Sequence, residues 1–146
     1  MALEQDLESE TVAADNSHSL RYVQGREAFV RMWGEEATRR FETNIEGVSP
    51  ELLQFIMEHA FGDVWIRDAL DAKTRSLVTI AVLGTLGRTR QLGEHVEGAL
   101  NNGASEEEIM ETLLHLGPYA GIPAAWDSME MAQRIFRTRH RRPRKD

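Results

Sequence analysis

The sequence contains no cysteine. Structural disulfides, thiolate metal sites and every reaction that uses the protein's own thiol are therefore excluded. Long apolar runs are missing too, since none approaches the ~20 residues that a membrane-spanning helix needs. The first residues are acidic, whereas a secretory signal starts with basic residues followed by an apolar stretch. We therefore expect a cytoplasmic protein with no membrane partner.

Positive charge is scarce relative to negative charge. The 146 residues hold 17 Lys and Arg against 24 Asp and Glu, a formal net charge of -7. Because nucleic-acid binding is driven mainly by Lys and Arg, this balance disfavours a nucleic-acid partner. The length indicates one domain with a hydrophobic core, and 41% hydrophobic residues are typical of an ordinary globular protein.

The two ends of the chain differ in charge. Residues 1–19 are acidic and poor in large apolar side chains, which predicts a loose tail. The domain itself is expected over residues 20–136. Residues 137–146 are rich in arginine. They are interpreted as an RNA or anionic-lipid patch, a solvated tail, or a cation-rich helix end. The absence of aromatic residues between the arginines favours the last two.

Apolar residues recur at helical spacing through the body of the chain. The spacing predicts helices over residues 20–41, 50–62, 71–84, 89–102, 105–115 and 124–136, with a break at Gly117–Pro123. The predicted N-terminal caps are Ser49 before Pro50, Asp71, and Ser105 with Glu108, and Gly103 is a helix stop. The third helix is apolar nearly all round, which indicates a central buried helix. With no strand–helix alternation, the sequence predicts an all-α fold of about six helices.

His95 is the strongest candidate for chemistry. It lies three residues after Leu92 and four before Ala99, on or beside the buried stripe of its helix. One interpretation is a catalytic histidine and the other is a structural histidine whose nitrogens are hydrogen-bonded. The neighbouring Glu94 faces about 100° away on the helix, so it is not automatically a partner.

Further polar candidates stand elsewhere in the chain. Glu111 and His115 are spaced i, i+4 and share a helix face, which is only half of a metal site unless His95 joins them. Arg67 and Arg75 flank the start of the third helix, where an arginine binds a carboxylate through a bidentate fork. Alternatively, Arg75 forms an ion pair with Asp71.

The order of these residues resembles a known family. The stretches GDVWIRDALDAKTRSLVTIAVL, LGEHVEGALNNGASEEEIMETLLH and YAGIPAAWDSMEMA, between Gly62 and Ala132, are similar to the carboxymuconolactone decarboxylase family. The resemblance implies the helical bundle of the alkylhydroperoxidase-D-like proteins. The peroxidase branch carries a C-x-x-C and a relay carboxylate, where this chain has Arg88, Gln91 and Ser76. Thiol peroxidase activity is therefore not expected.

The resemblance implies cofactor-independent decarboxylation of 4-carboxymuconolactone to 3-oxoadipate enol-lactone, in protocatechuate breakdown, with no metal. His95 would be the general acid, because the pKa of histidine lies near working pH. The expected substrate-binding residues are Arg67, Arg75, Trp65, Tyr119 and Trp126, with Glu94, Glu111 and His115 as possible support. Trp65 and Tyr119 are alternatively core residues with satisfied polar tips.

Two alternatives remain at this stage. One is a tailoring decarboxylase or cyclase that acts on another small unsaturated acid or lactone, since fold does not fix function. The other is a non-catalytic oligomer that binds a small molecule. The family resemblance also implies a homo-oligomer, a trimer or a hexamer, and an apolar third helix is consistent with burial at its interface.

Overall fold

The computed structural model describes residues 18–142, and every regular element in that range is a helix. The predicted all-α class is confirmed, although the chain forms more segments than the six expected. Residues 1–17 of the predicted acidic tail and 143–146 of the basic terminus lie outside the described range. Within that range, no helix is both long and apolar enough to cross a bilayer. The elements are α1 (Leu20–Trp33), α2 (Glu35–Glu46), α3 (Pro50–Phe55), the π-helix η1 (Ile56–Trp65), α4 (Ala72–Thr85), α5 (Thr89–Asn101), α6 (Glu106–Leu114), α7 (Leu116–Ala120) and α8 (Ile122–Arg141).

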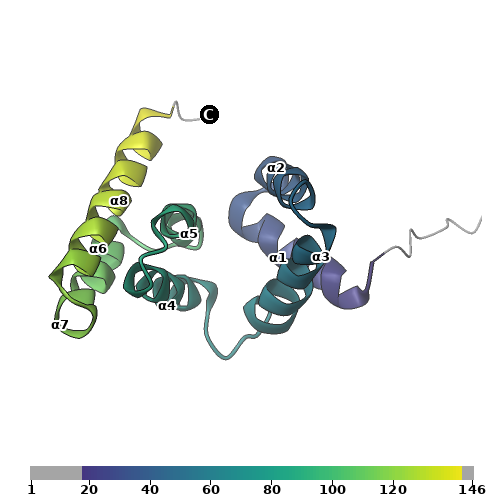
Figure 1. Cartoon of the computed structure of the whole chain (residues 1–146), viewed down its shortest axis with the longest axis horizontal. Coiled ribbons are helices and arrows are strands. Elements are labelled where there is room, and N and C mark those ends of the chain that lie inside the picture. The colour runs from purple at the N-terminus through teal and green to yellow at the C-terminus, as the bar shows by residue number, and fades with distance from the viewer. Residues whose placement is uncertain (1–17, 143–146) are drawn as a thin grey trace, which may run out of the picture.

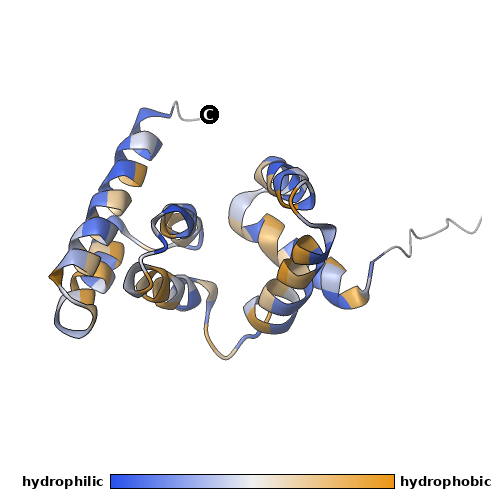
Figure 2. Cartoon of the chain, viewed as in Figure 1, coloured by the Kyte–Doolittle hydropathy of each residue, from blue (hydrophilic) through white to orange (hydrophobic). Residues whose placement is uncertain are grey.

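The helices gather into two lobes (Figure 1). The N-terminal lobe consists of α1, α2, α3 and η1, the C-terminal lobe consists of α4 to α8, and residues 66–71 connect them. Each lobe has its own core, which includes Tyr22, Phe29, Met57 and Phe61 in the first and Ile80, Leu92, Val96, Ile109 and Leu113 in the second. Long stretches of η1 and α4 consist of hydrophobic residues, drawn in orange in Figure 2.

The predicted helix starts are confirmed where a local side chain caps them. Ser49 Oγ accepts a hydrogen bond from the Leu52 amide at 3.1 Å, with Pro50 in the first turn. Asp71 accepts from the Thr74 amide at 2.7 Å. Ser105 and Glu108 form the reciprocal capping box. These bonds satisfy amides that have no partner inside their own helix.

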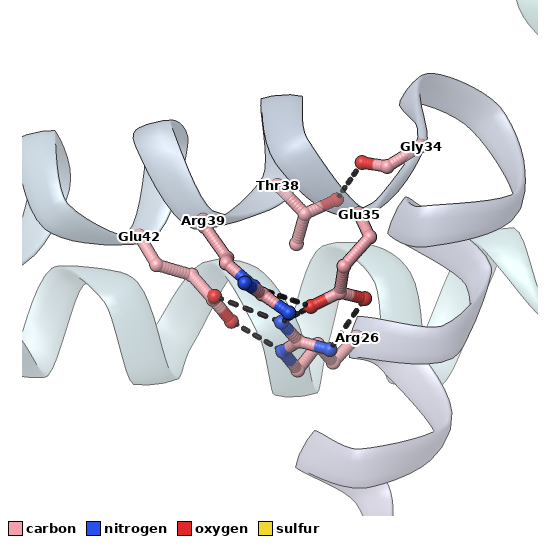
Figure 3. A network of polar contacts seen from close by, with 6 residues as sticks. All are labelled: Arg26, Gly34, Glu35, Thr38, Arg39 and Glu42. Carbon is pink, nitrogen blue, oxygen red and sulfur yellow. Dashed lines mark hydrogen bonds and ion pairs between the residues drawn. The ribbon is translucent and has the colours of Figure 1, made fainter.

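The predicted helix over residues 20–41 is wrong as a single element. The chain breaks at Gly34, whose φ of 85° suits a glycine, and α2 sets off in a new direction. Arg26 then ties α2 to α1 (Figure 3), because its Nε donates to Glu42 at 2.6 Å and its Nη2 donates to Glu35 at 2.8 Å. These carboxylates raise the pKa of Arg26, and Arg26 lowers that of Glu35.

The predicted stop at Gly62 is also wrong, because the helix continues as a π-helix to Trp65. Glycine serves here for close packing. A Cβ on Gly62 would collide with the Arg21 carbonyl oxygen of α1, and one on Gly25 would collide with the Met57 carbonyl oxygen of η1. The missing side chains therefore let the backbones of α1 and η1 touch.

The third predicted helix, α4, is not buried all round. Ser76, Ile80 and Gly84 face the core, whereas Val78 and Val82 are 50% and 51% exposed. Its neighbours within the chain cover only one of its faces, so periodicity alone overstated its burial.

The end of the chain is more helical than expected. Residues Leu116–Ala120 form α7, and only Gly121, with φ of 101°, breaks the chain there. The last helix runs on to Arg141, so much of the expected basic terminus is helical. Arg139 and Arg142 pair with Glu97 of α5 at 3.4 and 2.7 Å. These contacts fit the cation-rich helix end among the alternatives.

Candidate functional site

His95 lies in the seam between the two lobes. Its ring centroid is 6.1 Å from that of Trp65 at the end of η1, with the planes 23° apart. Trp33 at the end of α1 meets the same imidazole edge-on, at 5.2 Å and 79°. The histidine from the C-terminal lobe is therefore enclosed by two tryptophans from the N-terminal lobe.

The surroundings of His95 keep its imidazole neutral. Its Nδ1 is buried and has no hydrogen-bond partner among the described residues, unlike the satisfied structural histidine of the alternative reading. Burial lowers the pKa of His95 from 6.5 to about 4, because a low-polarity environment disfavours the charged form. His95 was expected to act as the acid because the pKa of histidine lies near working pH. That expectation about its pKa is wrong for the protein without substrate.

Arg75 contacts Arg67 in the segment that follows Trp65. Arg75 Nη2 donates to the Arg67 backbone carbonyl at 3.0 Å, whereas the Arg75 Nε is buried without a partner in the described part of the chain. Asp71 caps α4, and no ion pair joins it to Arg75 within residues 18–142. The segment from Trp65 to Arg67 thus contacts His95 through the Trp65 ring and Arg75 through the Arg67 backbone carbonyl.

The π-helix η1 ends at Trp65 and places its ring beside His95. In it, the Ile66 amide donates to the Phe61 carbonyl five residues back, at 3.2 Å. The Trp65 ring stacks on that of Phe61 with the planes 14° apart, so its position is set by the aromatic core of the lobe. Single π-helical turns occur often at functional sites.

The remaining predicted residues lie elsewhere in the chain. Glu111, His115 and Trp126 line a separate groove of about 700 Å³ between α6, α7 and α8. Tyr119 is 81% exposed on α7, and Trp126 is 68% exposed. Glu94 also faces solvent. Within one chain, these residues do not join the group formed by His95, Trp65, Arg67 and Arg75.

The metal alternative has no geometric support. Among residues 18–142, no three His, Asp or Glu side chains are grouped so that they could hold a metal ion. His115 and Glu111 face the groove of the C-terminal lobe, while His95 faces the two tryptophans.

Sequence reasoning did not single out Trp33, which is one of several apolar residues at helical spacing in residues 20–41. A signal was present in Gly98, three residues after His95 on α5. Glycine inside a helix is unfavourable unless packing requires it. A Cβ on Gly98 would collide with Met32 and approach Trp33 within 3.2 Å, so this glycine marks where α1 docks.

The fold and the seam define a class. This is an all-α protein in which a half-buried, neutral histidine stacks on Trp65, while an arginine that contacts the Arg67 carbonyl has a buried Nε without a partner in residues 18–142. Comparison with known proteins makes the class specific: a model of the carboxymuconolactone decarboxylase family matches residues 50–134. The chain belongs to this family.

Two relatives are decarboxylases by name. The chain is 41% identical, over 80% of its own length and 87% of the relative's, to a 4-carboxymuconolactone decarboxylase of Acinetobacter baylyi. It is 40% identical to a nitrosuccinic acid decarboxylase of Metarhizium robertsii, over 57% of this chain and 58% of that protein. A decarboxylase-type enzyme is thereby established as the class of activity.

Proposed function

We propose that the chain decarboxylates 4-carboxymuconolactone to 3-oxoadipate enol-lactone without a cofactor. The similarity to the Acinetobacter enzyme over most of both chains supports this substrate. The observation that carries the proposal is a pair of buried side-chain nitrogens, His95 Nδ1 and Arg75 Nε, for which residues 18–142 offer no hydrogen-bond partner. Buried polar atoms are normally hydrogen-bonded, so these two atoms, whose residues both contact the segment from Trp65 to Arg67, support a place for a polar ligand.

The reaction needs an anchor, an electron sink and a proton. The bond between the lactone ring and its carboxylate breaks, and CO2 leaves. The electron pair stays on the ring and delocalises through the double bond onto the lactone carbonyl oxygen. One proton then adds to carbon and gives the enol-lactone. Because the substrate is its own electron sink, this route requires no cofactor.

The seam residues divide these tasks between them. Arg75, whose Nε has no partner in the described part of the chain, binds a substrate carboxylate by a charge-assisted hydrogen bond, and the exposed Arg67 attracts the second carboxylate. Trp65 and Trp33 exclude water, which favours dispersed charge over a localised carboxylate. His95 supplies the proton.

The low pKa of free His95 adds a condition to this role. The imidazole is neutral before substrate binds. A substrate carboxylate beside it favours the protonated form and raises its pKa. His95 therefore takes up a proton together with the substrate and passes it to carbon after CO2 has left.

The proposal includes a homo-oligomer of three or six subunits. Apolar side chains are exposed on α4 and around the groove of the C-terminal lobe, and large exposed apolar patches mark interaction surfaces. They include Val78, Val82, Leu114, Ile122 and Trp126. A neighbouring subunit would cover Tyr119 and Trp126, the two predicted substrate-binding residues that stand apart from His95. Sedimentation of the purified protein tests this, and a monomer at micromolar concentration refutes it.

A second candidate substrate is a nitro acid, favoured by the similarity to the nitrosuccinic acid decarboxylase. Nitrosuccinate also carries carboxylates beside a group that can accept the electron pair left by CO2. The same arginine and histidine would serve it. A cytoplasmic location, expected from the sequence, suits either small anionic substrate and stays a prediction.

The deciding experiment measures CO2 release from 4-carboxymuconolactone and, in parallel, from nitrosuccinate. His95→Ala is expected to lower kcat by about a hundredfold or more. Arg75→Met is expected to raise KM by about tenfold or more, because a charged hydrogen bond is lost. His59→Ala, at an exposed histidine of the N-terminal lobe, is the matched control and should keep full activity.

The outcomes separate the candidates. Turnover of 4-carboxymuconolactone that depends on His95 supports the proposal, and preference for nitrosuccinate supports the second candidate. A folded protein that binds either acid without releasing CO2 would be the non-catalytic binder.

A further inference from the structure

Trp33 touches the proposed site from outside the part of the chain that the family model matches, which begins at residue 50. It is the last residue of α1. Its indole Nε1–H donates to the Glu94 backbone carbonyl at 3.2 Å, one residue before His95. Its ring lies edge-on to the imidazole at 5.2 Å. One side chain thus contacts both the backbone and the ring at the catalytic position.

The end of α1 is held against α5 by more than this bond. Asn101 Nδ2 donates to the Met32 carbonyl at 2.8 Å, and Arg139 of α8 donates to Asn101 Oδ1 at 2.9 Å. Gly98 provides the space, since a side chain there would collide with Met32. The contact between the lobes is therefore built around the two residues that end α1.

The turn after Trp33 is fixed as well. Thr38 Oγ1 donates to the Gly34 carbonyl at 2.8 Å, and Arg26 bridges α1 to Glu35 and Glu42 of α2 (Figure 3). The turn after Trp33 is therefore held by α2, and the Trp33 side chain is held by its hydrogen bond to α5.

We propose that Trp33 is a positioning residue of the decarboxylase site, which holds the His95 imidazole in one orientation against Trp65 and keeps water from it. Trp65 lies nearly parallel to the imidazole and Trp33 nearly perpendicular. Rotation of the imidazole out of its plane would lose one contact or the other, so the two rings together fix the plane in which the histidine nitrogens lie. The inference rests on the proposed function, because it gives His95 its catalytic role.

The test compares three variants of the full-length protein. Trp33→Leu removes the aromatic wall and the N–H donor, Trp33→Phe keeps the wall and loses only the donor, and Phe55→Leu is a control at an exposed ring of α3. The first readout is the titration of the His95 imidazole by NMR, which needs no substrate. The second is the division of any loss between kcat and KM.

Trp33→Leu is expected to move the His95 pKa up from about 4 toward 6.5, because water reaches the ring. It should also lower kcat by about tenfold with little change in KM, since the proton donor is misplaced while the carboxylate anchor remains. Trp33→Phe should keep the low pKa and lose only about threefold in kcat. The control should match the wild type.

An unchanged His95 titration in folded Trp33→Leu, or an unchanged kcat, overturns the inference. Should Trp33→Leu fail to fold, Trp33→Phe decides: a kcat equal to that of the wild type overturns the inference, and the selective loss supports it. If no substrate is turned over at all, the proposed function fails, while the titration still decides whether Trp33 shields His95.

Discussion

The cores of the two lobes consist of different kinds of side chain. The N-terminal lobe packs aromatic rings, with Phe29 4.8 Å from Phe61 and 4.3 Å from Trp33 between centroids. The C-terminal lobe packs aliphatic side chains such as Ile80 and Leu113. In the N-terminal lobe, α1 and η1 touch backbone to backbone, whereas the core of the C-terminal lobe consists of packed aliphatic side chains.

This difference explains where the proposed site lies. The aliphatic lobe supplies the residues that titrate or carry charge, His95 and Arg75. The aromatic lobe supplies flat walls, Trp33 and Trp65, which contact the imidazole without offering it a hydrogen bond. The low pKa of His95 is a property of the seam, because burial is its cause.

The largest effect is expected from breaking the aromatic lobe at its tightest point. In Gly25→Ala the new Cβ would collide with the Met57 carbonyl oxygen and lie 2.7 Å from the Gly62 amide. Because these neighbours are backbone atoms, they can move only at a large cost in free energy. We therefore expect a loss of about 3 kcal/mol or more in unfolding free energy. Urea denaturation followed by tryptophan fluorescence measures it.

Gly47→Ala is the control for that substitution. Its φ of -64° suits alanine and the nearest atom to its Cβ would be 3.4 Å away, so stability should stay level or rise slightly. Equal stability of Gly25→Ala and the wild type would show that α1 and η1 are not packed as described.

A second prediction concerns how burial of His95 between the lobes makes the unfolding free energy depend on pH. Between pH 6.5 and about 4, the unfolded chain binds a proton on His95 that the native protein excludes. Stability therefore falls as the pH drops through this window, by about 3 kcal/mol at pH 4, and His95 contributes nothing above it. His95→Gln removes this loss.

The measurement is the unfolding free energy of both proteins at pH 7 and pH 4. Carboxylates with lowered pKa, such as those of Asp71 and Glu108, also weaken the fold in acid, but they are common to both proteins and cancel in the difference. Parallel pH profiles for the two proteins would contradict the buried neutral histidine.

The smallest expected effect is the difference in stability lost when one or the other of two ion pairs in the N-terminal lobe is removed. Arg26 and Glu42 are 30% and 18% exposed, whereas Arg40 and Glu36 are 70% and 84% exposed. Glu42→Gln is expected to cost about 1 kcal/mol of stability, and Glu36→Gln close to nothing. Chemical denaturation of the two variants side by side tests this, and equal losses would mean that the network in Figure 3 does not pin α2 to α1.

Much of the fold was predictable from short-range patterns. Asp71, Ser49 and the Ser105–Glu108 capping box mark helix starts in the sequence, because a capping bond joins residues three positions apart. The break at Gly34 was not predictable in this way, since the periodicity of α1 continues smoothly into α2. There the direction of the chain depends on Arg26 reaching Glu42 across the turn.

For the candidate site, the sequence pointed to His95, Trp65, Arg67 and Arg75, and in the structure Trp65 contacts His95 while the Arg67 carbonyl accepts from Arg75. The structure leaves Tyr119 and Trp126 at the surface of the other lobe. Exposure depends on what the remaining helices cover, and spacing along one helix carries no information about that.

The sequence by itself determined the all-α class, the capped helix starts at Ser49, Asp71 and Ser105, and membership of a decarboxylase family. Each of these depends on residue identity or on bonds within one helical turn. The tertiary structure alone decided that His95 is neutral, that the buried Arg75 Nε finds no partner within residues 18–142, and that Trp33 reaches the histidine. These properties arise where residues as far apart as Trp33 and Glu94 meet, because burial and its effect on a pKa belong to the packed surroundings of a group.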